Sequence, residues 1–292
     1  MIARSLRLAG VGVRAEIVGP CDPDHVTARF GEFFVQELDE DPAWTVRVEV
    51  AEGRWEVPEG AGVFPGVAVR REGERVVYTR QTDVTVLDPA RRTLTVRARP
   101  SPRGLEPVQD PTPLDTPLRL LMAYVLPRRG GVLVHACGWA ECDPGFAAGA
   151  LVFAAVSGGG KTTTARKLPH AGILSDDQVA LTREAGGVWM AHSLPFVGEY
   201  RRAPRAQRAP LRGVVLLGKG EAVRQEAVAR PRAVASLVRC GVYFTPGDAG
   251  AVGVLDALMS VAGEVPVTRW VLTLESPVLD MARAAIGSPS GT

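Results

Sequence analysis

Several features that would mark a particular class of protein are missing from this chain. It has no run of about 18 uncharged apolar residues, so the sequence predicts no membrane-spanning helix. The four cysteines are widely spaced and contain no Cys-x-x-Cys pair, which gives no support to a zinc site or a disulfide framework. Arg7 and Arg14 interrupt the apolar segment that a secretion signal would need. We therefore expect a cytoplasmic protein with reduced thiols and no membrane partner.

A strong excess of one charge is also lacking. Lysine and arginine number 34 against 32 acidic residues, a formal net charge of +2, and no block of like charge appears. A nucleic-acid partner is therefore not expected. Lysine is scarce, with 3 residues against 31 arginines, so a lysine at the key place of a motif carries more weight than usual. The 292 residues, 46% of them hydrophobic, can form the core of one large domain or of two ordinary ones.

The most informative stretch begins with an apolar run at residues 151–156, which predicts a buried strand. It leads into Ser157, Gly158, Gly159, Gly160, Lys161, Thr162 and Thr163. This fits the pattern G-x-x-x-x-G-K-[ST], except that Ala155 stands where the first glycine is usual. Glycines let backbone N–H groups converge on phosphate oxygens. Lys161 can neutralise the outer phosphates, and the Thr162 hydroxyl can bind Mg²⁺. The stretch therefore predicts an ATP-binding loop.

Two adjacent carboxylates, Asp176 and Asp177, follow Lys161 after only a short helix, expected at 162–168, and a strand at 173–175. This is close to the shortest crossover that can join two parallel strands, so we expect the pair to lie beside the loop. One carboxylate can hold Mg²⁺ while the other accepts a proton from an attacking hydroxyl, and we favour Asp176 as the base and Asp177 as the metal ligand. The pair could instead cap a turn.

Other candidate residues flank this stretch. His135 lies in an apolar strand expected at 132–137, where it is either a core residue or a group that orients the reacting centre. Glu199 lies in a loop and could complete the metal site, or it could be a solvated side chain. The arginines that follow could bind phosphate or form a solvated surface: Arg201, Arg202, Arg205, Arg208 and Arg212. The other histidines and the cysteines are given no functional role.

The first third of the chain predicts an antiparallel β meander. Alternating or apolar runs at 44–50, 76–80, 84–87 and 93–99 are typical of strands. Residues 1–40 carry a weaker signal, with a helix expected at 25–34. A segment rich in proline and glycine, 100–114, is expected to be a linker.

After this linker, Thr116 is expected to cap a helix with Pro117 at its first position. That helix presents an apolar stripe of Leu118, Leu121, Met122 and Val125. Further strands are expected at 189–194, 213–217 and 267–275, and helices at 231–240, 251–262 and 277–286. We therefore divide the chain into a β-rich region, 1–112, which could recognise an acceptor, and a catalytic domain, 113–292.

The order of His135, the Ser-Gly-Gly-Gly-Lys-Thr loop and the Leu-Ser-Asp-Asp stretch resembles the catalytic domain of HPr kinase/phosphorylase and, more distantly, the nucleotide core of phosphoenolpyruvate carboxykinase. The likeness covers roughly residues 113–220. It implies a mixed α/β fold with a P-loop core of this type, ATP and Mg²⁺ as cofactors, an aspartate as general base toward a serine, and a glutamate near the metal. The long glycine-rich signature of full HPr kinases is absent here, so the chain is most similar to the shorter HPr-kinase-related proteins, some of which phosphorylate a peptide's serine.

From these residues we expect a kinase that transfers the γ-phosphoryl group of ATP to a hydroxyl, in first place a serine of a protein or peptide. One alternative is a non-catalytic ATP-binding module within a peptide-modification assembly, which would need the loop but no base. Another is a small-molecule kinase or a carboxykinase-like enzyme, in which the arginines after Glu199 would bind the substrate.

Overall fold

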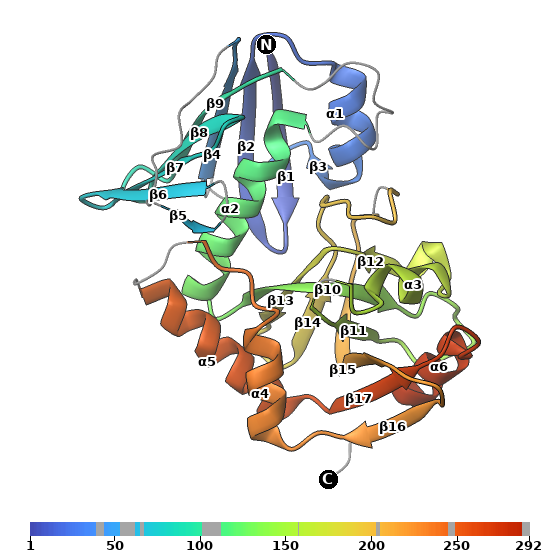
Figure 1. The fold of residues 1–292 in the computed structure, drawn as a ribbon. Helices are drawn as coiled ribbons and strands as arrows, with labels where there is room; N and C mark the ends of the chain where they lie inside the picture. The colour runs from blue at the N-terminus through green and yellow to red at the C-terminus, as the bar shows by residue number, and fades with distance from the viewer. Residues whose placement is uncertain are drawn as a thin grey trace. The chain divides into compact units, whose positions relative to one another are not determined.

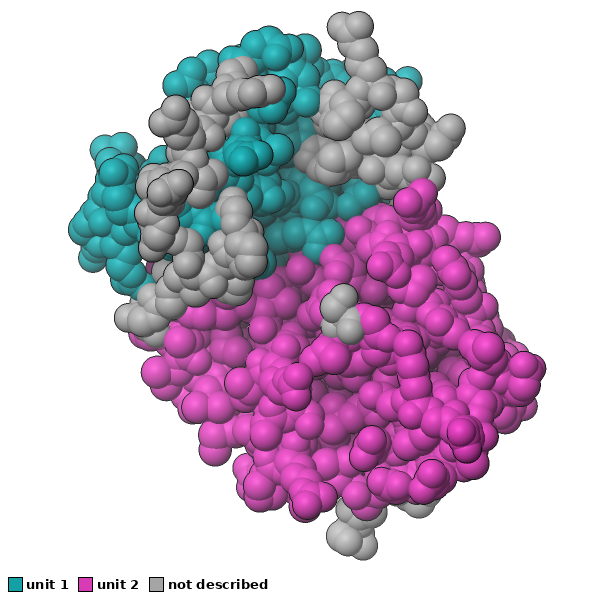
Figure 2. All heavy atoms as spheres, viewed as in Figure 1, with its two compact units in different colours: residues 1–122, 244–247 teal, residues 123–243, 248–292 magenta. Residues whose placement is uncertain are grey.

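The computed structural model describes residues 1–38, 44–52, 62–64, 67–100, 112–156, 158–202, 205–244 and 249–287. Within these ranges the fold is mixed α/β, with two large mixed sheets and six α-helices (Figure 1). The chain forms two compact units, coloured separately in Figure 2. Unit 1 comprises 1–122 with 244–247, and unit 2 comprises 123–243 with 248–292. The division falls inside helix α2 (Thr112–Arg128).

Unit 1 contains a nine-stranded sheet in the order β3-β1-β2-β4-β9-β8-β7-β6-β5. Its strands are β1 (Ile2–Leu8), β2 (Val11–Val18), β3 (Phe34–Val35), β4 (Trp44–Val50), β5 (Gly62–Phe64), β6 (Val67–Glu72), β7 (Arg75–Thr79), β8 (Asp83–Asp88) and β9 (Thr93–Ala98). Strands β7 to β9 pair antiparallel, as expected for a meander, and β6, which was not predicted, extends it. The expectation is wrong for β4, which pairs in parallel with both β2 and β9. The chain after β4 runs outward and returns through β9, so β4 neighbours the last strand of the meander.

The hairpin of β1 and β2 was not predicted. Its signal is the alternation of Val11, Val13, Ala15 and Ile17, all buried, with polar or small residues between them. The turn at Ala9 and Gly10 has φ values of 45° and 78°, the left-handed conformation that suits a two-residue hairpin loop.

The helix expected at 25–34 lies earlier, at α1 (Pro23–Phe30). The Asp22 side chain accepts the N–H of Asp24 at 2.9 Å, and Pro23 fits the first helical position. The N-terminus of the helix is therefore determined by this Asp-Pro pair.

Helix α2 begins at Thr112, so the prediction that Thr116 caps it and Pro117 opens it is wrong. The first turn contains Asp115, whose carboxylate pairs with Arg29 of α1 at 2.5 Å and with Arg119 at 2.6 Å. This buried network holds the start of α2 and explains its extension toward the N-terminus. The expected apolar stripe is buried, as predicted: Leu118, Leu121, Met122 and Val125. Residues 101–111 of the expected linker lie outside the described ranges.

Unit 2 contains an eight-stranded sheet in the order β11-β10-β13-β14-β15-β17-β16, with β12 paired to β10 and β11 also paired to β15. Its strands are β10 (Val132–Ala140), β11 (Ala150–Ala154), β12 (Ile173–Ser175), β13 (Gln178–Arg183), β14 (Trp189–His192), β15 (Arg208–Lys219), β16 (Arg224–Ala227) and β17 (Val267–Leu272). Its other helices are α3 (Lys161–Arg166), α4 (Arg230–Val238), α5 (Ala249–Glu264) and α6 (Val278–Gly287). Strands β13 and β16 were not predicted.

The crossover from β11 to β12 positions the candidate site. Both strands pair antiparallel with β10, one on each side of it. Ala154, at the end of β11, lies opposite Ala136, and Ser175, at the end of β12, lies opposite Gly138. The ends of β11 and β12 therefore lie at nearly the same level of β10, and the chain continues from β12 through Asp176 and Asp177 into β13 along the same strand.

Two apolar clusters cover the faces of this sheet. Residues of α4 and α5 pack on one face, with Val134, Val152 and Val214. Residues of α3 and α6 pack on the other, where Phe153 and Trp270 meet edge to face with ring centroids 5.8 Å apart. Figure 1 shows the two helix pairs on different sides of the strands. Among the described residues, no helix is long and apolar enough to cross a membrane.

Candidate functional site

The glycine loop, defined here as residues 155–162, joins β11 to α3. Gly158 and Gly160 have φ values of +74° and +100°, a region that favours glycine. A Cβ atom on Gly159 would lie 2.5 Å from the Cβ of Ala155 and 2.9 Å from the carbonyl oxygen of Val156. The shape of this loop therefore depends on its glycines. Ser157, one of the predicted phosphate-binding residues, lies outside the described ranges.

Lys161 directs its ammonium group back into this loop. Its Nζ donates to the carbonyl oxygens of Ala155 at 2.8 Å and Val156 at 3.3 Å, and only 8% of the residue is exposed. Burial lowers the pKa of the ammonium, while negative charge on neighbouring groups, including Asp177 and Glu199, opposes this shift. The loop therefore holds a buried cation whose neighbours are neutral carbonyls and two carboxylates.

Asp176 anchors a distant loop. Its Oδ1 accepts the N–H of Gly198 at 2.9 Å, and its Oδ2 accepts the N–H of Tyr200 at 2.6 Å. Gly198 can carry no side chain here, because a Cβ atom would lie 2.7 Å from Oδ2. Burial raises the pKa of Asp176, and the two backbone N–H groups act in the opposite direction. Both carboxylate oxygens thus hold the two residues on either side of Glu199.

Glu199 reaches the glycine loop as a result. Its Oε2 accepts the Thr162 hydroxyl at 3.2 Å, although 37 positions separate the two residues in sequence. A hydroxyl and a carboxylate are oxygen ligands that suit Mg²⁺, which keeps several waters and also binds phosphate oxygens. The described residues contain no group of three or more His, Cys, Asp or Glu side chains that could hold a metal by themselves. Mg²⁺ at this place would therefore depend on bound phosphate.

Asp177 faces in another direction, toward β10. Its Oδ1 lies 3.1 Å from Nδ1 of His135, and both side chains remain partly accessible, at 20% and 38%. The hydroxyl of buried Ser175 accepts the N–H groups of Asp177 and Gln178, both at 3.1 Å. The carbonyl oxygen of Asp177 accepts the N–H of Ala136 at 3.0 Å. Backbone and side chain therefore fix this carboxylate beside the imidazole.

Gln178 is a further polar residue here that the sequence did not single out. It lies opposite His135 in the β10–β13 register, so both side chains are on the same face of the sheet. The residue is buried, and its Oε1 has no hydrogen-bond partner. A buried amide oxygen without a partner is unusual, and it can accept a donor from a bound molecule.

A cavity of about 270 Å³ borders the α3 side of the glycine loop. It is lined by Gly159, Gly160 and Thr163 from the loop and α3, and by apolar side chains that include Leu217, Leu272 and Val278. The other two lysines of the chain, Lys167 and Lys219, also line it. In a chain with 31 arginines, all three lysines therefore lie in the glycine loop or line the cavity beside it.

The arginines that follow Glu199 do not converge on the loop as a group. Arg208 pairs with Glu184 at 2.7 Å, and Arg212 donates to the carbonyl oxygen of Ala148 at 3.3 Å. The guanidinium of Arg202 lies over the ring of Tyr200, 5.6 Å from its centroid. At least three of the five side chains thus have contacts elsewhere, so the five arginines do not form a single phosphate-binding cluster.

The site consequently combines residues from four separated segments of unit 2: His135, the glycine loop, the Asp176–Asp177 pair and Glu199. No protein-family model matches the chain, and no curated protein matches it. Any function must therefore be inferred from these residues. Their arrangement provides a buried cation, a hydroxyl paired with a carboxylate, and a second carboxylate paired with an imidazole, which are groups that phosphoryl transfer uses.

Proposed function

We propose that this protein is an ATP- and Mg²⁺-dependent kinase with a P-loop core of the HPr kinase type, and that it phosphorylates a hydroxyl, in first place a serine of a protein or peptide. The supporting observation is the contact between Thr162 and Glu199. Asp176 holds the backbone around Glu199, and this brings the carboxylate to the hydroxyl that follows Lys161 in the glycine loop. A glycine-rich turn with an incidental lysine would not require such a partner.

In this proposal the backbone N–H groups of Gly158 and Gly160 bind the phosphates of ATP, while the N–H of Gly159 donates to the carbonyl oxygen of Val156 at 3.0 Å and shapes the loop. Lys161 exchanges its carbonyl contacts for phosphate oxygens, a change that replaces two neutral acceptors with charged ones. Thr162 and Glu199 would hold Mg²⁺ together with the phosphates. The metal ion supplies neutralisation of charge on the transferring phosphoryl group. The cavity on the α3 side, which Thr163 helps to line, accepts the nucleoside.

The contacts lead us to reassign both aspartates, which the sequence suggested as base (Asp176) and metal ligand (Asp177). Both oxygens of Asp176 already accept backbone N–H groups, so we assign it to positioning Glu199. Asp177 is more accessible and lies against His135, so we assign it to proton transfer. The acceptor oxygen bonds to the γ-phosphorus, the bond from that phosphorus to ADP breaks, and the hydroxyl proton passes to Asp177. His135 orients the carboxylate that receives it.

Binding and turnover of ATP test this proposal. Wild type, Lys161→Ala and Asp177→Asn would be compared by calorimetry with MgATP, and by ADP formation with a panel of serine peptides. We expect Lys161→Ala to weaken ATP binding by at least about tenfold, because a charge-assisted contact is lost. Asp177→Asn should bind ATP normally and lose turnover by about 100-fold or more. Wild type that fails to bind MgATP would refute the proposal, and tight binding without hydrolysis or transfer would favour the non-catalytic alternative.

A further inference from the structure

A second cavity in unit 2, of about 550 Å³, lies on the opposite side of the strands, under helix α4. Its floor includes Leu216 of β15, and its wall includes Ala155 and Val156 of the glycine loop. The roles proposed for the loop, the aspartates and Glu199 use none of the side chains that surround this cavity. Its polar lining is Glu226, Arg232, Ser236, Arg239, Cys240 and Arg269.

The charge of this lining is mainly positive. Three arginines against one glutamate leave a formal excess of two positive charges. Among the described residues, Arg232, Arg239 and Arg269 form no ion pair with a carboxylate, unlike Arg183, which pairs with Glu264 at 3.0 Å. Arg232 lies in α4, Arg239 directly follows that helix as its C-cap, and Arg269 lies in β17, which is distant in sequence. Guanidinium groups that converge on a cavity are suited to carboxylate or phosphate.

The cavity is also lined by residues that contact Lys161 and His135. The carbonyl oxygens of Ala155 and Val156, two of its lining residues, are the ones that hold the Lys161 ammonium. Cys240, another lining residue, accepts the N–H of His135 with its carbonyl oxygen at 2.7 Å. A molecule in this cavity would therefore be next to both the cation of the loop and the strand that carries the histidine.

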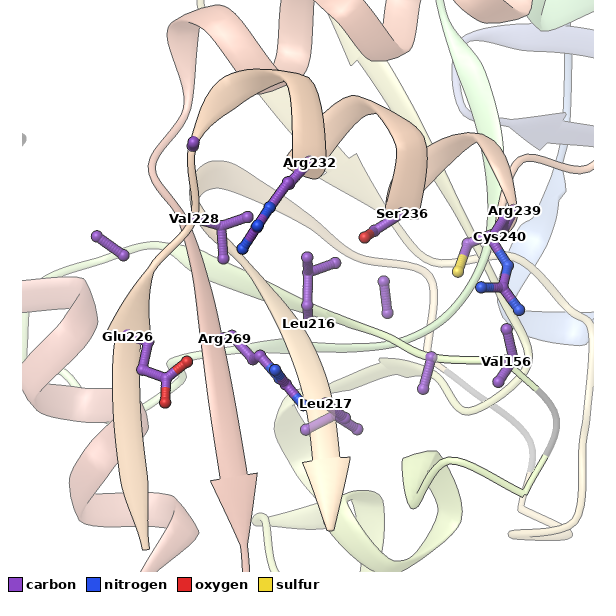
Figure 3. Close-up of a pocket in the computed structure, with 14 residues that line it drawn as sticks. Val156, Leu216, Leu217, Glu226, Val228, Arg232, Ser236, Arg239, Cys240 and Arg269 are labelled. Carbon is purple, nitrogen blue, oxygen red and sulfur yellow. The ribbon is translucent and has the colours of Figure 1, made fainter. Parts of the chain in front are cut away.

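The arginines lie toward different ends of the cavity. Figure 3 shows Arg239 and Cys240 toward the end where Val156 lies, and Glu226, Arg232 and Arg269 toward the other. The first end is next to the proposed phosphoryl-transfer centre, and the second is farther from it. This separation suits an acceptor that places its hydroxyl at the loop and a negative group some distance away.

We propose that this cavity is the acceptor site of the kinase, and that Arg232 and Arg269 select a hydroxyl compound that carries a carboxylate or phosphate group. The inference rests on the proposed function and narrows its substrate class. Two sources share this chemistry, a serine peptide with acidic neighbours and a small hydroxy acid. The phosphoryl group moves from ATP to the acceptor hydroxyl, ADP leaves, and the hydroxyl proton goes to Asp177, so no other reactant is needed.

Matched probes test this selectivity. One pair is a serine peptide flanked by glutamates and the same peptide with glutamines, and the other is glycerate and glycerol. Binding would be measured by calorimetry in the presence of MgADP, and transfer from radiolabelled ATP. The proteins are wild type, the double variant Arg232→Gln/Arg269→Gln, and Arg224→Gln, an exposed arginine of β16 outside the cavity. ATP affinity is measured for all three.

In wild type we expect the anionic member of at least one pair to bind at least about tenfold more tightly than its neutral counterpart. The double variant should lose this preference with unchanged ATP affinity, and Arg224→Gln should keep it. The pair that responds identifies the source, peptide or small molecule. Equal binding of the charged and neutral probes, no binding of any probe, or weaker ATP binding in the double variant would each overturn the inference. Failure of wild type to bind MgATP would instead overturn the proposed function.

Discussion

The Asp176 carboxylate accepts the backbone N–H of Tyr200 at 2.6 Å across 24 positions of sequence, and its second oxygen accepts that of Gly198. Asp176→Asn would leave one of these partly buried N–H groups facing an amide NH₂. We expect a loss of about 1–3 kcal/mol in the free energy of unfolding, because a partly buried donor loses its acceptor. Turnover should fall as well, since Glu199 is no longer held near Thr162.

Asp177→Asn is the matched comparison, because the Asp177 carboxylate faces the imidazole of His135, with Oδ1 and Nδ1 3.1 Å apart. We expect it to lose turnover with a clearly smaller change in stability. Urea unfolding followed by fluorescence, together with ATP turnover, separates the two effects. If Asp176→Asn were as stable as wild type and still inactive, Asp176 would act in the chemistry and not in positioning.

A methyl group at Gly198 should reproduce the defect of Asp176→Asn. In Gly198→Ala the new Cβ would lie 2.7 Å from Oδ2 of Asp176 and 3.0 Å from Cβ of Asp177, so the loop must move away. We expect a destabilisation of about 1–3 kcal/mol and a higher Mg²⁺ requirement. Gly31→Ala, whose nearest neighbour would be a methyl carbon at 3.5 Å, serves as the control. A fully active Gly198→Ala would contradict the proposed link between this loop and metal binding.

Glu199→Gln should change the response to Mg²⁺ and leave the fold intact. The side chain is directed at the Thr162 hydroxyl on an accessible part of the loop, so the amide can keep that hydrogen bond but cannot offer a charged ligand. We expect the Mg²⁺ concentration for half-maximal ATP turnover to rise by about tenfold or more. The control is Glu72→Gln, because Glu72 forms an exposed ion pair with Arg70 in unit 1. An unchanged Mg²⁺ titration would remove Glu199 from the metal site.

His192 should make the stability of unit 2 depend on pH. Burial lowers its pKa to about 4 from the ordinary 6.5, and its Nε2 lies 2.7 Å from the Thr182 hydroxyl. The folded-state pKa is thus below the unfolded value, so the unfolded chain binds more protons between these two values. The stabilisation that the neutral His192 side chain gives to the folded state is complete above pH 6.5 and is lost as the pH falls toward 4.

The corresponding measurement is urea unfolding of wild type and His192→Gln across this range. Between pH 7 and pH 4, the free energy of unfolding of wild type should fall by up to about 3 kcal/mol more than that of the variant. At about pH 8 the unfolding free energies of the two proteins should change with pH at the same rate, because the His192 imidazole is neutral in both the folded and the unfolded state. Parallel curves throughout the acidic range would show that His192 is not buried in its neutral form.

Short-range patterns predicted a large part of the site. The strand, glycine loop, short helix and second strand between Leu151 and Ser175 lie close together in sequence, so their arrangement is limited by chain length. The position of Lys161 follows from that unit. The burial of Leu118 and Leu121 on one helix face follows from their periodicity in the same way.

Long-range pairings were not predictable from such patterns. Nothing in the alternation of β4 reveals that it pairs in parallel with both β2 and β9, because alternation identifies a strand but not its neighbours. The role of Asp176 depends on a loop 22 to 24 residues later, whose one sequence signal is Gly198 before Glu199. Arg232 and Arg269 lie on elements whose existence was predicted, but their convergence on one cavity depends on the tertiary packing.

The glycine loop offers the last prediction, since two neighbouring glycines are required for different reasons. Gly160 has φ of +100° and open space around its Cβ position, so Gly160→Ala is opposed by backbone conformation alone. We expect it to cost about 1 kcal/mol of stability. Gly159→Ala is opposed by contact, because its Cβ would lie 2.5 Å from that of Ala155.

Both variants should weaken ATP binding, while Gly186→Ala, with open space and no positive φ, should not. A further distinction comes from the double variant Gly159→Ala/Ala155→Gly. It removes the shorter clash, with the Ala155 methyl group, and leaves the 2.9 Å approach to the Val156 carbonyl oxygen, so recovery is expected to be partial. It also restores the glycine usual at the first place of the motif. We expect this variant to recover ATP affinity, measured by calorimetry, toward that of wild type. Gly160→Ala/Ala155→Gly should recover none, because no contact causes its defect. If both double variants recovered ATP affinity equally, steric contact and not backbone conformation would be the cause of the Gly160→Ala defect.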